Sequence, residues 1–355
     1  MRIGIDTQTS LGQKTGFGFY VSNLVKELKR LGNHQYMSFA PKTEHDFSAP
    51  QRFWWDQVVL PGRAAAEKVD ILHQPAFSAP VLYRGKVVVT VHDLVAIFFG
   101  QEIPFFSRQY FGRWMPFSYR FADHIIAISE NTKRDIVRTL GIPQERITVI
   151  YEAAPEHYQP VKNVSQLKRI TKRYQTGEQY LLHIGTLNPR KNLSFLIEIF
   201  AELIKSNPRL NLVISGKAGW YYEGLFRQVD QLGLSGRVKF IGYVPEADKP
   251  ALLSGAYAFV FPSRYEGFGL PVLEAMACGA PVVAANVSAI PEVVGKGGVL
   301  LPLSGRDAWV KALRRIGRPS FRSKLVASGQ KQARKFSWRK AAEQTVAVYE
   351  RVNSQ

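Results

Sequence analysis

The sequence contains a pair of glutamates, Glu266 and Glu274, separated by a glycine-containing segment. The segment follows a short apolar run, and Pro271 suits the first turn of a helix, where a missing N–H costs little. Glycines allow a ligand close to the backbone, free N–H groups at a helix start bind phosphate, and carboxylates accept hydrogen bonds from hydroxyl groups. The pattern therefore predicts a site for a ligand with phosphate and several hydroxyls. The residues between the glutamates that we expect to line it are Gly267, Phe268, Gly269 and Leu270.

Two further loops place cations directly after expected strands. Arg190 and Lys191 lie between the strand candidate at 180–184 and the next helix, and Gly216 and Lys217 follow the strand candidate at 210–215. An arginine presents a fork of donors and a lysine a point charge, so both suit phosphate. Solvated surface cations are the alternative interpretation. Ligands of open α/β sheets bind at the carboxyl ends of the strands, which favours a phosphate site.

The first half of the chain offers weaker candidates. Gly16 and Gly18 open a helix after the first strand candidate, but their spacing lacks the full dinucleotide fingerprint, so a plain glycine turn is an equal alternative. His92 and Asp93 follow the β-branched run at 86–91, where a polar pair suits a ligand crevice. A structural histidine is the alternative there, and for His73 the structural interpretation is favoured.

Apolar runs alternate with helical patterns along the whole chain, which predicts two successive α/β halves with parallel sheets. We expect a first domain at residues 1–165, a second at 166–336 and a hinge near 160–178. A final helix at 337–355, capped by Ser337, completes the first domain. The strand candidates are 2–6, 70–73, 86–91, 125–128 and 147–150, then 180–184, 210–215, 238–241, 258–261 and 281–284.

Composition narrows the classes of protein. The 355 residues are 46% hydrophobic, so the chain can bury full cores. The lone cysteine, Cys278, excludes an internal disulfide framework and, with no apparent signal peptide or membrane span, predicts a cytoplasmic protein. No Cys/His cluster has metal-ligand spacing. The net charge of +19 is concentrated at 306–340, where solvated helix faces, an anionic membrane surface and nucleic acid are the possible explanations.

Together these segments resemble the retaining glycosyltransferases of family 4, in the mannosyltransferase-like branch. The strongest resemblance is the glutamate pair within PSRYEGFGLPVLEAMACGAPVV. The other matching segments are Ile184–Asn192, Gly236–Tyr243, Ile290–Val294 and Phe336–Trp338 in the second half, and Gly16–Gly18, Val91–Asp93 and Ala127–Glu130 in the first. The resemblance covers essentially the whole chain.

That family implies the GT-B fold, in which two facing Rossmann-like domains enclose the active site in their cleft. It implies a nucleoside-diphosphate-sugar donor, no cofactor and no obligatory metal. By resemblance, Arg190 and Lys191 hold the donor diphosphate, Glu274 binds the ribose, and Glu266 binds the transferred sugar. Gly16 and Gly18 approach the donor phosphate or the acceptor, His92 lies by the transferred sugar, and Asp93 lies on the acceptor side. Many members carry an arginine where this chain has Thr186, and the loop with Arg190 favours GDP-mannose over a UDP-sugar.

The expected reaction transfers a hexose, with mannose favoured, to a glycan or a polyprenyl-diphosphate-linked glycan. The leaving diphosphate develops charge that Arg190, Lys191 and helix-start N–H groups can stabilise. A retaining glycosidase uses an enzyme nucleophile. The sequence identifies none here, so we expect a front-face route in which the leaving phosphate assists the acceptor hydroxyl.

The segment at 105–121 mixes Phe, Tyr and Trp with three arginines and has no acid. It predicts peripheral contact with the inner face of a membrane, binding of a lipid-diphosphate acceptor, or a helix buried against the first domain. Other enzymes on a similar scaffold, a nucleotide-sugar epimerase or a phosphorylase, are alternatives. A basic nucleic-acid-binding protein is a remote alternative, because paired carboxylates repel phosphate backbones; we therefore expect no nucleic-acid partner.

Overall fold

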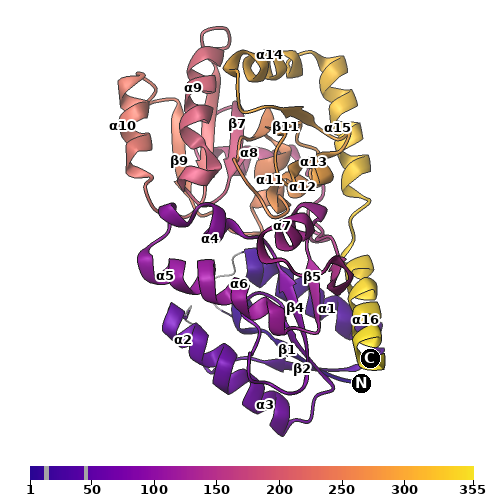
Figure 1. Cartoon of the computed structure of the whole chain (residues 1–355). Helices are drawn as coiled ribbons and strands as arrows, with labels where there is room; N and C mark the ends of the chain where they lie inside the picture. The colour runs from indigo at the N-terminus through magenta and orange to yellow at the C-terminus, as the bar shows by residue number, and fades with distance from the viewer. Residues whose placement is uncertain (12–15, 44–46) are drawn as a thin grey trace. The chain divides into compact units, whose positions relative to one another are not determined.

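The computed structural model describes residues 1–11, 16–43 and 47–355 (Figure 1). The chain divides into two units, residues 1–153 together with 337–355 and residues 154–336. The first unit thus ends at Ala153 and not at residue 165, where the sequence placed the boundary. The hydroxyl of Tyr158 donates to Glu246 at 2.6 Å, and the N–H of Val161 donates to the Ser254 hydroxyl at 3.0 Å. These bonds attach residues 154–165 to the second unit.

Within the described residues, the first unit is built on a six-stranded parallel sheet in the order β2-β1-β3-β4-β5-β6. Its centre is strongly apolar: Val87, Val88, Val89 and Val91 of β4 are all at most 1% exposed. Strands buried on both faces need such continuous β-branched runs. The strands are β1 (Arg2–Asp6), β2 (Gln35–Phe39), β3 (Ile71–Gln74), β4 (Lys86–Val91), β5 (His124–Ala127) and β6 (Ile147–Val149).

Helices surround this sheet, several of them short. The larger ones are α1 (Gly16–Leu31), α3 (Leu60–Ala66), α7 (Glu130–Leu140) and α16 (Trp338–Ser354). The segment predicted at 105–121 is a broken series rather than one buried helix: α5 (Phe105–Gln109), η4 (Tyr110–Trp114), α6 (Met115–Ser118) and η5 (Tyr119–Phe121). The remaining elements are η1 (Gln8–Ser10), α2 (Ala49–Trp54), η2 (Trp55–Val59), α4 (Val95–Phe98), η3 (Gly100–Glu102) and η6 (Gln144–Arg146).

The C-terminal helix α16 packs beside α1 (Figure 1). It begins where Ser337 accepts a hydrogen bond from the N–H of Lys340. The Tyr349 hydroxyl lies 2.6 Å from Nδ1 of His73, whose Nε2 lies 2.9 Å from the Thr90 hydroxyl. Burial, together with nearby His92, lowers the pKa of His73 to about 3, so its ring is neutral and holds the helix to the sheet by hydrogen bonds. His73 is therefore structural.

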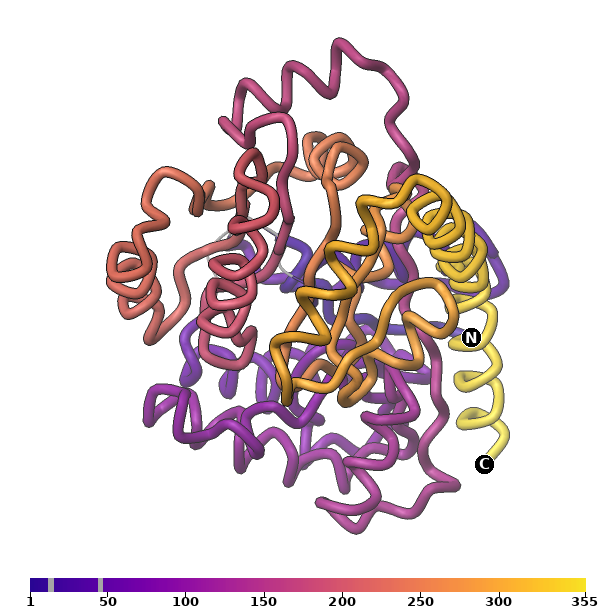
Figure 2. Tube along the Cα trace, turned by 90° about the horizontal axis from the view of Figure 1, so that it is seen from above, coloured from indigo at the N-terminus to yellow at the C-terminus, as the bar shows by residue number. Residues whose placement is uncertain are grey.

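The second unit has another six-stranded parallel sheet among the described residues, in the order β12-β11-β10-β7-β8-β9. Helices α9 and α10 lie side by side on one flank, as both views show (Figures 1 and 2). The strands are β7 (Gln179–Ile184), β8 (Leu210–Ser215), β9 (Val238–Gly242), β10 (Ala258–Phe261), β11 (Val282–Ala285) and β12 (Val299–Leu301). The helices are α8 (Val164–Arg173), η7 (Pro189–Lys191), α9 (Leu193–Leu203), α10 (Glu223–Gln231), α11 (Lys249–Ser254), α12 (Leu270–Ala277), α13 (Ile290–Val294), α14 (Arg306–Ile316) and α15 (Pro319–Ala333).

Each sheet reverses its direction of growth once. In the second sheet the chain starts at β7, adds β8 and β9 on one side, and then returns to add β10, β11 and β12 on the other. The crevice between β7 and β10, at their carboxyl ends, is where an open α/β sheet binds its ligand. The corresponding position in the first sheet lies between β1 and β3.

Candidate active site

The loops that follow β7 and β10 meet at the reversal point of the second sheet. The N–H of Arg264 donates to the carbonyl oxygen of Arg190 at 2.8 Å, which ties the two loops together. The guanidinium of Arg190 also donates to the carbonyl oxygen of Tyr265. Residues 74 positions apart in the chain are thus fixed next to each other by backbone groups.

Glu266 forms ion pairs with both predicted phosphate-binding cations. Its Oε1 lies 2.6 Å from Nζ of Lys191 and its Oε2 lies 2.9 Å from a terminal nitrogen of Arg190. The side chains of Lys191 and Glu266 are 8% and 10% exposed, and that of Arg190 is 17% exposed. The Lys191 ammonium also lies 4.9 Å from the centre of the Phe261 ring. Arg190 and Lys191, which the resemblance assigned to the diphosphate, therefore form one charged cluster with Glu266, which it assigned to the transferred sugar.

Burial alone would raise the pKa of Glu266, but the charges of Arg190 and Lys191 outweigh it and hold that pKa at about 2. The carboxylate is therefore ionised at physiological pH and can only accept hydrogen bonds. Each carboxylate oxygen has two lone pairs and spends one on a cation, which leaves acceptor capacity for a ligand hydroxyl.

A capped 3₁₀ turn, η7, carries the two cations. The side-chain oxygen of Asn188 accepts a hydrogen bond from the N–H of Lys191 at 3.3 Å. Asn192 then takes a left-handed conformation with φ of 56° and starts α9. Asparagine tolerates this conformation better than most residues. The PRKN sequence thus sets the direction of both cations through its flanking asparagines.

The loop with Gly216 and Lys217 lies against the loop after β7. The N–H of Leu187 donates to the carbonyl oxygen of Lys217 at 3.0 Å, and the N–H of Gly185 donates to that of Ser215 at 2.9 Å. A Cβ added to Gly216 would lie 1.9 Å from the carbonyl oxygen of Gly185, and its φ is +153°. Only glycine fits there. The structure therefore brings Lys217 to the edge of the loop that carries Arg190 and Lys191.

The glycine-containing segment after Glu266 leads into α12. Gly269 has a φ of +107° and is the N-cap residue, and Leu270 is the first helical residue. The start of α12 exposes N–H groups of the kind that bind phosphate. Phe268 is 3% exposed and packs at 5.8 Å against Phe336. The two glycines therefore matter for the backbone of the segment, where Gly269 has a positive φ. The packing of Phe268 against Phe336 holds the segment in place.

Glu274 lies in a second buried cluster that the sequence did not reveal. Burial would lower the pKa of Lys249, but the charges of Glu274 and Glu246 raise it instead. Burial and the charges of the same two glutamates also raise the pKa of Tyr158. Glu274 is itself 6% exposed. Its charge raises the pKa of a lysine and of a tyrosine within the second unit. The sequence feature that could have identified Lys249 is its position at the start of α11, directly after Asp248.

In the first unit, His92 has an acceptor at each ring nitrogen. Its Nε2 lies 2.8 Å from the carbonyl oxygen of Pro75, and its Nδ1 lies 3.2 Å from Oε1 of Glu152. A carbonyl can only accept, so Nε2 carries a hydrogen. His92 and Glu152 are 7% and 5% exposed, so this contact lies away from bulk water.

Aromatic rings hold the His92 side chain in place. The rings of Phe17 and Tyr20 each lie 4.7 Å from that of His92. Phe17 stands between Gly16 and Gly18 in the first turn of α1, so the structure brings this predicted segment next to the histidine; Thr15 lies outside the described residues. Asp93 has another contact: its Oδ1 accepts a hydrogen bond from the N–H of Val95, the first residue of the short helix α4, at 2.9 Å.

Comparison with known proteins decides the family. Residues 15–154 match the model described as "Glycosyltransferase Family 4", and residues 164–335 match that described as "Glycosyl transferases group 1". The "O-antigen chain mannosyltransferase B" of Escherichia coli is 34% identical over 282 residues, which cover 79% of this chain and 74% of that protein. This chain belongs to the family 4 glycosyltransferases.

Further proteins are similar to this glycosyltransferase in sequence or in fold. The "Serotype-specific mannosyltransferase WbdA" of E. coli is 28% identical over 275 residues, 75% of this chain but 34% of that longer protein. Anabaena HepE, solved "in complex with UDP and glucose", matches with a TM-score of 0.75 at 19% identity over 99% of both chains. WaaG, "a glycosyltransferase involved in lipopolysaccharide biosynthesis", matches with a TM-score of 0.74 at 14% identity over 98% of this chain and 99% of that one. The GT-B fold class predicted from the sequence is confirmed.

Two further observations on the glycosyltransferase concern metal-binding groups and membrane-spanning helices. Across its described residues, His, Cys, Asp and Glu side chains form no group of three or more with the geometry to hold a metal ion. None of the helices in the described part of the chain is both long and apolar enough to span a bilayer.

Proposed function

We propose that this glycosyltransferase transfers mannose from GDP-mannose, with retention of anomeric configuration and without an obligatory metal ion. The observation that carries the proposal is the cluster of Arg190, Lys191 and Glu266 at the reversal point of the second sheet. It combines two cations for a diphosphate with an ionised carboxylate for hydroxyl groups, at the position where such sheets bind ligands.

In this proposal the second unit binds the donor. The Arg190 guanidinium has five N–H donors, so it can bind diphosphate oxygens while it keeps its contact with Glu266. Lys191 supplies a second positive charge, and the start of α12 at Gly269 and Leu270 adds backbone N–H groups. Glu266 accepts hydrogen bonds from hydroxyls of the transferred sugar. Glu274 accepts those of the ribose.

The leaving group is a nucleoside diphosphate, so negative charge grows on its β-phosphate as the anomeric C–O bond breaks. Arg190 and Lys191 stabilise that charge, the task that a divalent cation performs in many other transferases. Glu266 is a poor nucleophile because both of its oxygens are ion-paired. These contacts support a front-face route, in which the acceptor hydroxyl attacks from the leaving-group side and gives its proton to the departing phosphate.

The names of the relatives favour mannose, whereas GDP is proposed from the family resemblance of the loop that carries Arg190; no contact in the fold selects either. The relative with 34% identity is an O-antigen chain mannosyltransferase, and WbdA is a mannosyltransferase as well. UDP-bound HepE belongs to the same fold at a much lower identity. We therefore propose mannose as the transferred sugar and a glycan, free or linked to a polyprenyl diphosphate, as the acceptor.

The first unit also carries an exposed aromatic and basic surface, which we define as Phe105, Phe106, Arg108, Arg113, Phe117, Arg120 and Phe121. Its phenylalanines are between 44% and 78% exposed. Exposed rings beside arginines suit the interface of a membrane that contains anionic lipid. We propose that this surface places the enzyme peripherally on the cytoplasmic face of a membrane. Flotation with anionic liposomes tests this: a Phe105→Ser, Phe106→Ser double variant should stay at the bottom while the wild type floats, and a wild type that also stays at the bottom would contradict it.

The proposed reaction is tested by incubating the enzyme with GDP-mannose, EDTA and a mannose-terminated acceptor glycan. We expect a product heavier by one hexose, with a one-bond C1–H1 coupling at the anomeric carbon that shows an α linkage as in the donor. Transfer of sugar from a free sugar phosphate would instead indicate a phosphorylase, and conversion of the nucleotide-sugar without an acceptor would indicate an epimerase.

A further inference from the structure

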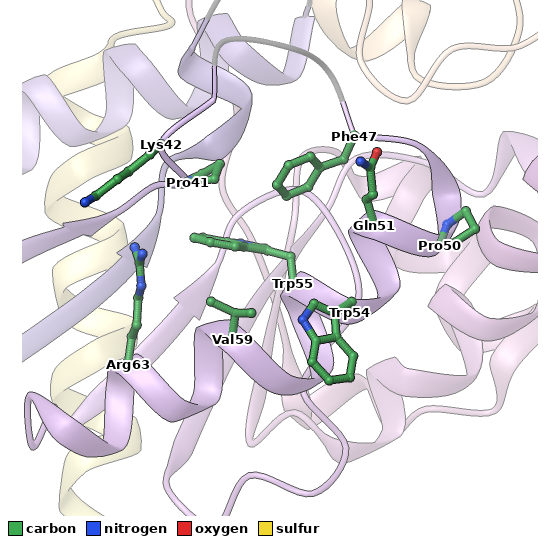
Figure 3. A pocket seen from close by; sticks show the side chains of 9 residues that line it. All are labelled: Pro41, Lys42, Phe47, Pro50, Gln51, Trp54, Trp55, Val59 and Arg63. Carbon is green, nitrogen blue, oxygen red and sulfur yellow. The ribbon is translucent and has the colours of Figure 1, made fainter.

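A pocket of about 600 Å³ opens in the first unit beside the carboxyl end of β2 (Figure 3). Its lining comes from the residues after that strand and from α2, η2 and α3. Phe47, Trp54, Trp55 and Val59 supply most of the apolar lining, with two prolines. Nothing in the proposed transfer mechanism uses this pocket.

Contacts with neighbouring residues hold Trp55, one wall of the pocket, in place. Trp55 is 4% exposed, and its indole N–H donates to Oδ1 of Asp6 at 3.2 Å. The Phe47 ring meets that of Trp55 edge-on at 5.9 Å, and the Arg63 guanidinium lies 5.1 Å from the Trp55 ring centre. Trp54, by contrast, is 60% exposed. The pocket therefore has a rigid aromatic back and a large, uncovered aromatic rim.

The charged residues among the described lining, Lys42 and Arg63, are both cations and lie at one end of the pocket. Lys42 and Arg63 stand together on one side of Trp55, and Trp54 stands on the other (Figure 3). Arg63 is held there by its hydrogen bond to the carbonyl oxygen of Ala40 at 2.8 Å. Among the described residues that line the pocket there is no Asp or Glu, and Gln51 is the one side-chain amide. A neutral sugar ring would need more acceptor groups for its hydroxyls, whereas an anion with an apolar body matches both ends.

The pocket lies on the same edge of the sheet as His92. Both follow the carboxyl ends of parallel strands, β2 for the pocket and β4 for His92. Three strand spacings separate these strands, about 14 Å. A line of contacts joins the two places: Asp6 pairs with Arg52 at 3.3 Å, Arg52 lies 3.9 Å from the Phe77 ring, and Phe77 packs at 5.7 Å against Phe17 beside His92. An extended acceptor could lie along this edge.

We propose that the pocket binds the prenyl diphosphate end of a lipid-linked acceptor, with Lys42 and Arg63 on the phosphates and Phe47, Trp54 and Trp55 on the first isoprene units. This inference rests on the proposed transferase function, and it assigns the acceptor's lipid end to residues outside the donor cluster. The sugars of the acceptor then extend along the sheet edge toward His92.

Isothermal titration of the full chain with farnesyl diphosphate tests the proposal, with inorganic diphosphate and farnesol as partial ligands and saturating GDP added to fill the donor cluster. We expect farnesyl diphosphate to bind in the presence of GDP and more tightly than either partial ligand. Lys42→Ser and Trp54→Ala should each weaken binding about tenfold, since each removes one charged or one large apolar contact. Arg84→Ser, which removes an exposed cation of the same unit outside the pocket, should have no effect.

Three results would overturn the proposal. Farnesyl diphosphate that GDP displaces would be bound at the donor cluster. Binding that survives in both pocket variants would lie elsewhere. Binding of a mannose disaccharide that is lost in Trp54→Ala, without binding of farnesyl diphosphate, would make the pocket a sugar subsite. If the enzyme still transfers mannose in any of these cases, only the pocket assignment fails; absence of GDP binding would instead count against the proposed function itself.

Discussion

Glu152 lies 3.2 Å from Nδ1 of His92, and the opposite ring nitrogen faces the carbonyl oxygen of Pro75 at 2.8 Å. The ring is thus held between two acceptors in a buried position. Any ligand group that bonds to His92 must replace one of them or meet the ring face. Glu152 directly precedes Ala153, the residue after which the chain enters the second unit. We infer that Glu152 is a positioning residue that fixes the orientation of the His92 ring.

Glu152→Gln tests this role while it keeps the ring in place, since the amide can still donate to a bare Nδ1. We expect kcat for mannose transfer to fall about 10- to 100-fold, the value of a hydrogen bond to a charged group. Donor-induced thermal stabilisation should not change, because the donor cluster lies in the second unit. Glu145→Gln, which alters an exposed carboxylate of the same unit, is the matched control. Unchanged kcat in Glu152→Gln would refute the role.

Arg190→Ala and Lys191→Ala should each reduce kcat about 10²- to 10³-fold, as expected when one stabilising contact to a developing anion is lost. The reason is that each cation meets the leaving diphosphate as well as Glu266. Steady-state transfer with GDP-mannose measures the change, and Lys205→Ala serves as the control because Lys205 lies on the exposed side of the same unit. A loss confined to KM would mean that the cations bind the donor but do not favour its departure.

Glu266→Gln should lower the free energy of unfolding of the second unit by up to about 3–5 kcal/mol at neutral pH, since it removes the buried carboxylate that both Arg190 and Lys191 contact. The pKa of Glu266 is about 2 in the fold, below the usual carboxyl value of 4.5. Its stabilisation is therefore complete above about pH 4.5 and is lost as the pH falls toward about 2. Urea unfolding at a series of pH values should show the two proteins converging in that window. A difference that stays constant down to about pH 3 would contradict the ion-pair explanation.

Gly216→Ala should disrupt the second unit, because its Cβ would lie 1.9 Å from the carbonyl oxygen of Gly185. The expected sign is a loss of several kcal/mol, as for other steric conflicts at special backbone positions. Gly224→Ala provides a matched control: Gly224 lies inside α10 with open space around it, and there alanine should stabilise by about 0.5–1 kcal/mol. Equal melting temperatures for the two variants would show that the loop around Gly216 adapts.

The sequence predicted the central strands and the edge strands β6 and β9 to within one residue, but it missed the edge strands β2 and β12. Strands β4, β8 and β10 begin and end where continuous apolar runs do, since they are buried on both faces. Strand β2 was missed because an edge strand with mixed exposure has no such run, and β12 is three residues long. The split of the segment at 105–121 into short pieces also carries no periodic signal.

The same limit applies to the site. The residue types of Arg190, Lys191 and Glu266 predicted a site for phosphate and hydroxyl groups. Their pairing with one another, however, depends on β7 lying next to β10, and this strand order cannot be inferred from the sequence of either segment. Glu152 reaches His92 from the loop after β6, two strands away from β4, so no spacing in the sequence joins them. For Asp93 the acceptor-side role stays a prediction, since the structure adds only its hydrogen bond from the N–H of Val95.

Thermal unfolding with GDP, UDP and ADP and their sugars, in EDTA, is the most direct test of the central claim that the second unit binds a nucleoside-diphosphate sugar without a metal ion. A ligand that binds the folded state raises the midpoint by mass action. The account predicts a clear rise with GDP and GDP-mannose that is lost in Glu274→Ala. No rise with any nucleotide, or an equal rise in the variant, would contradict it.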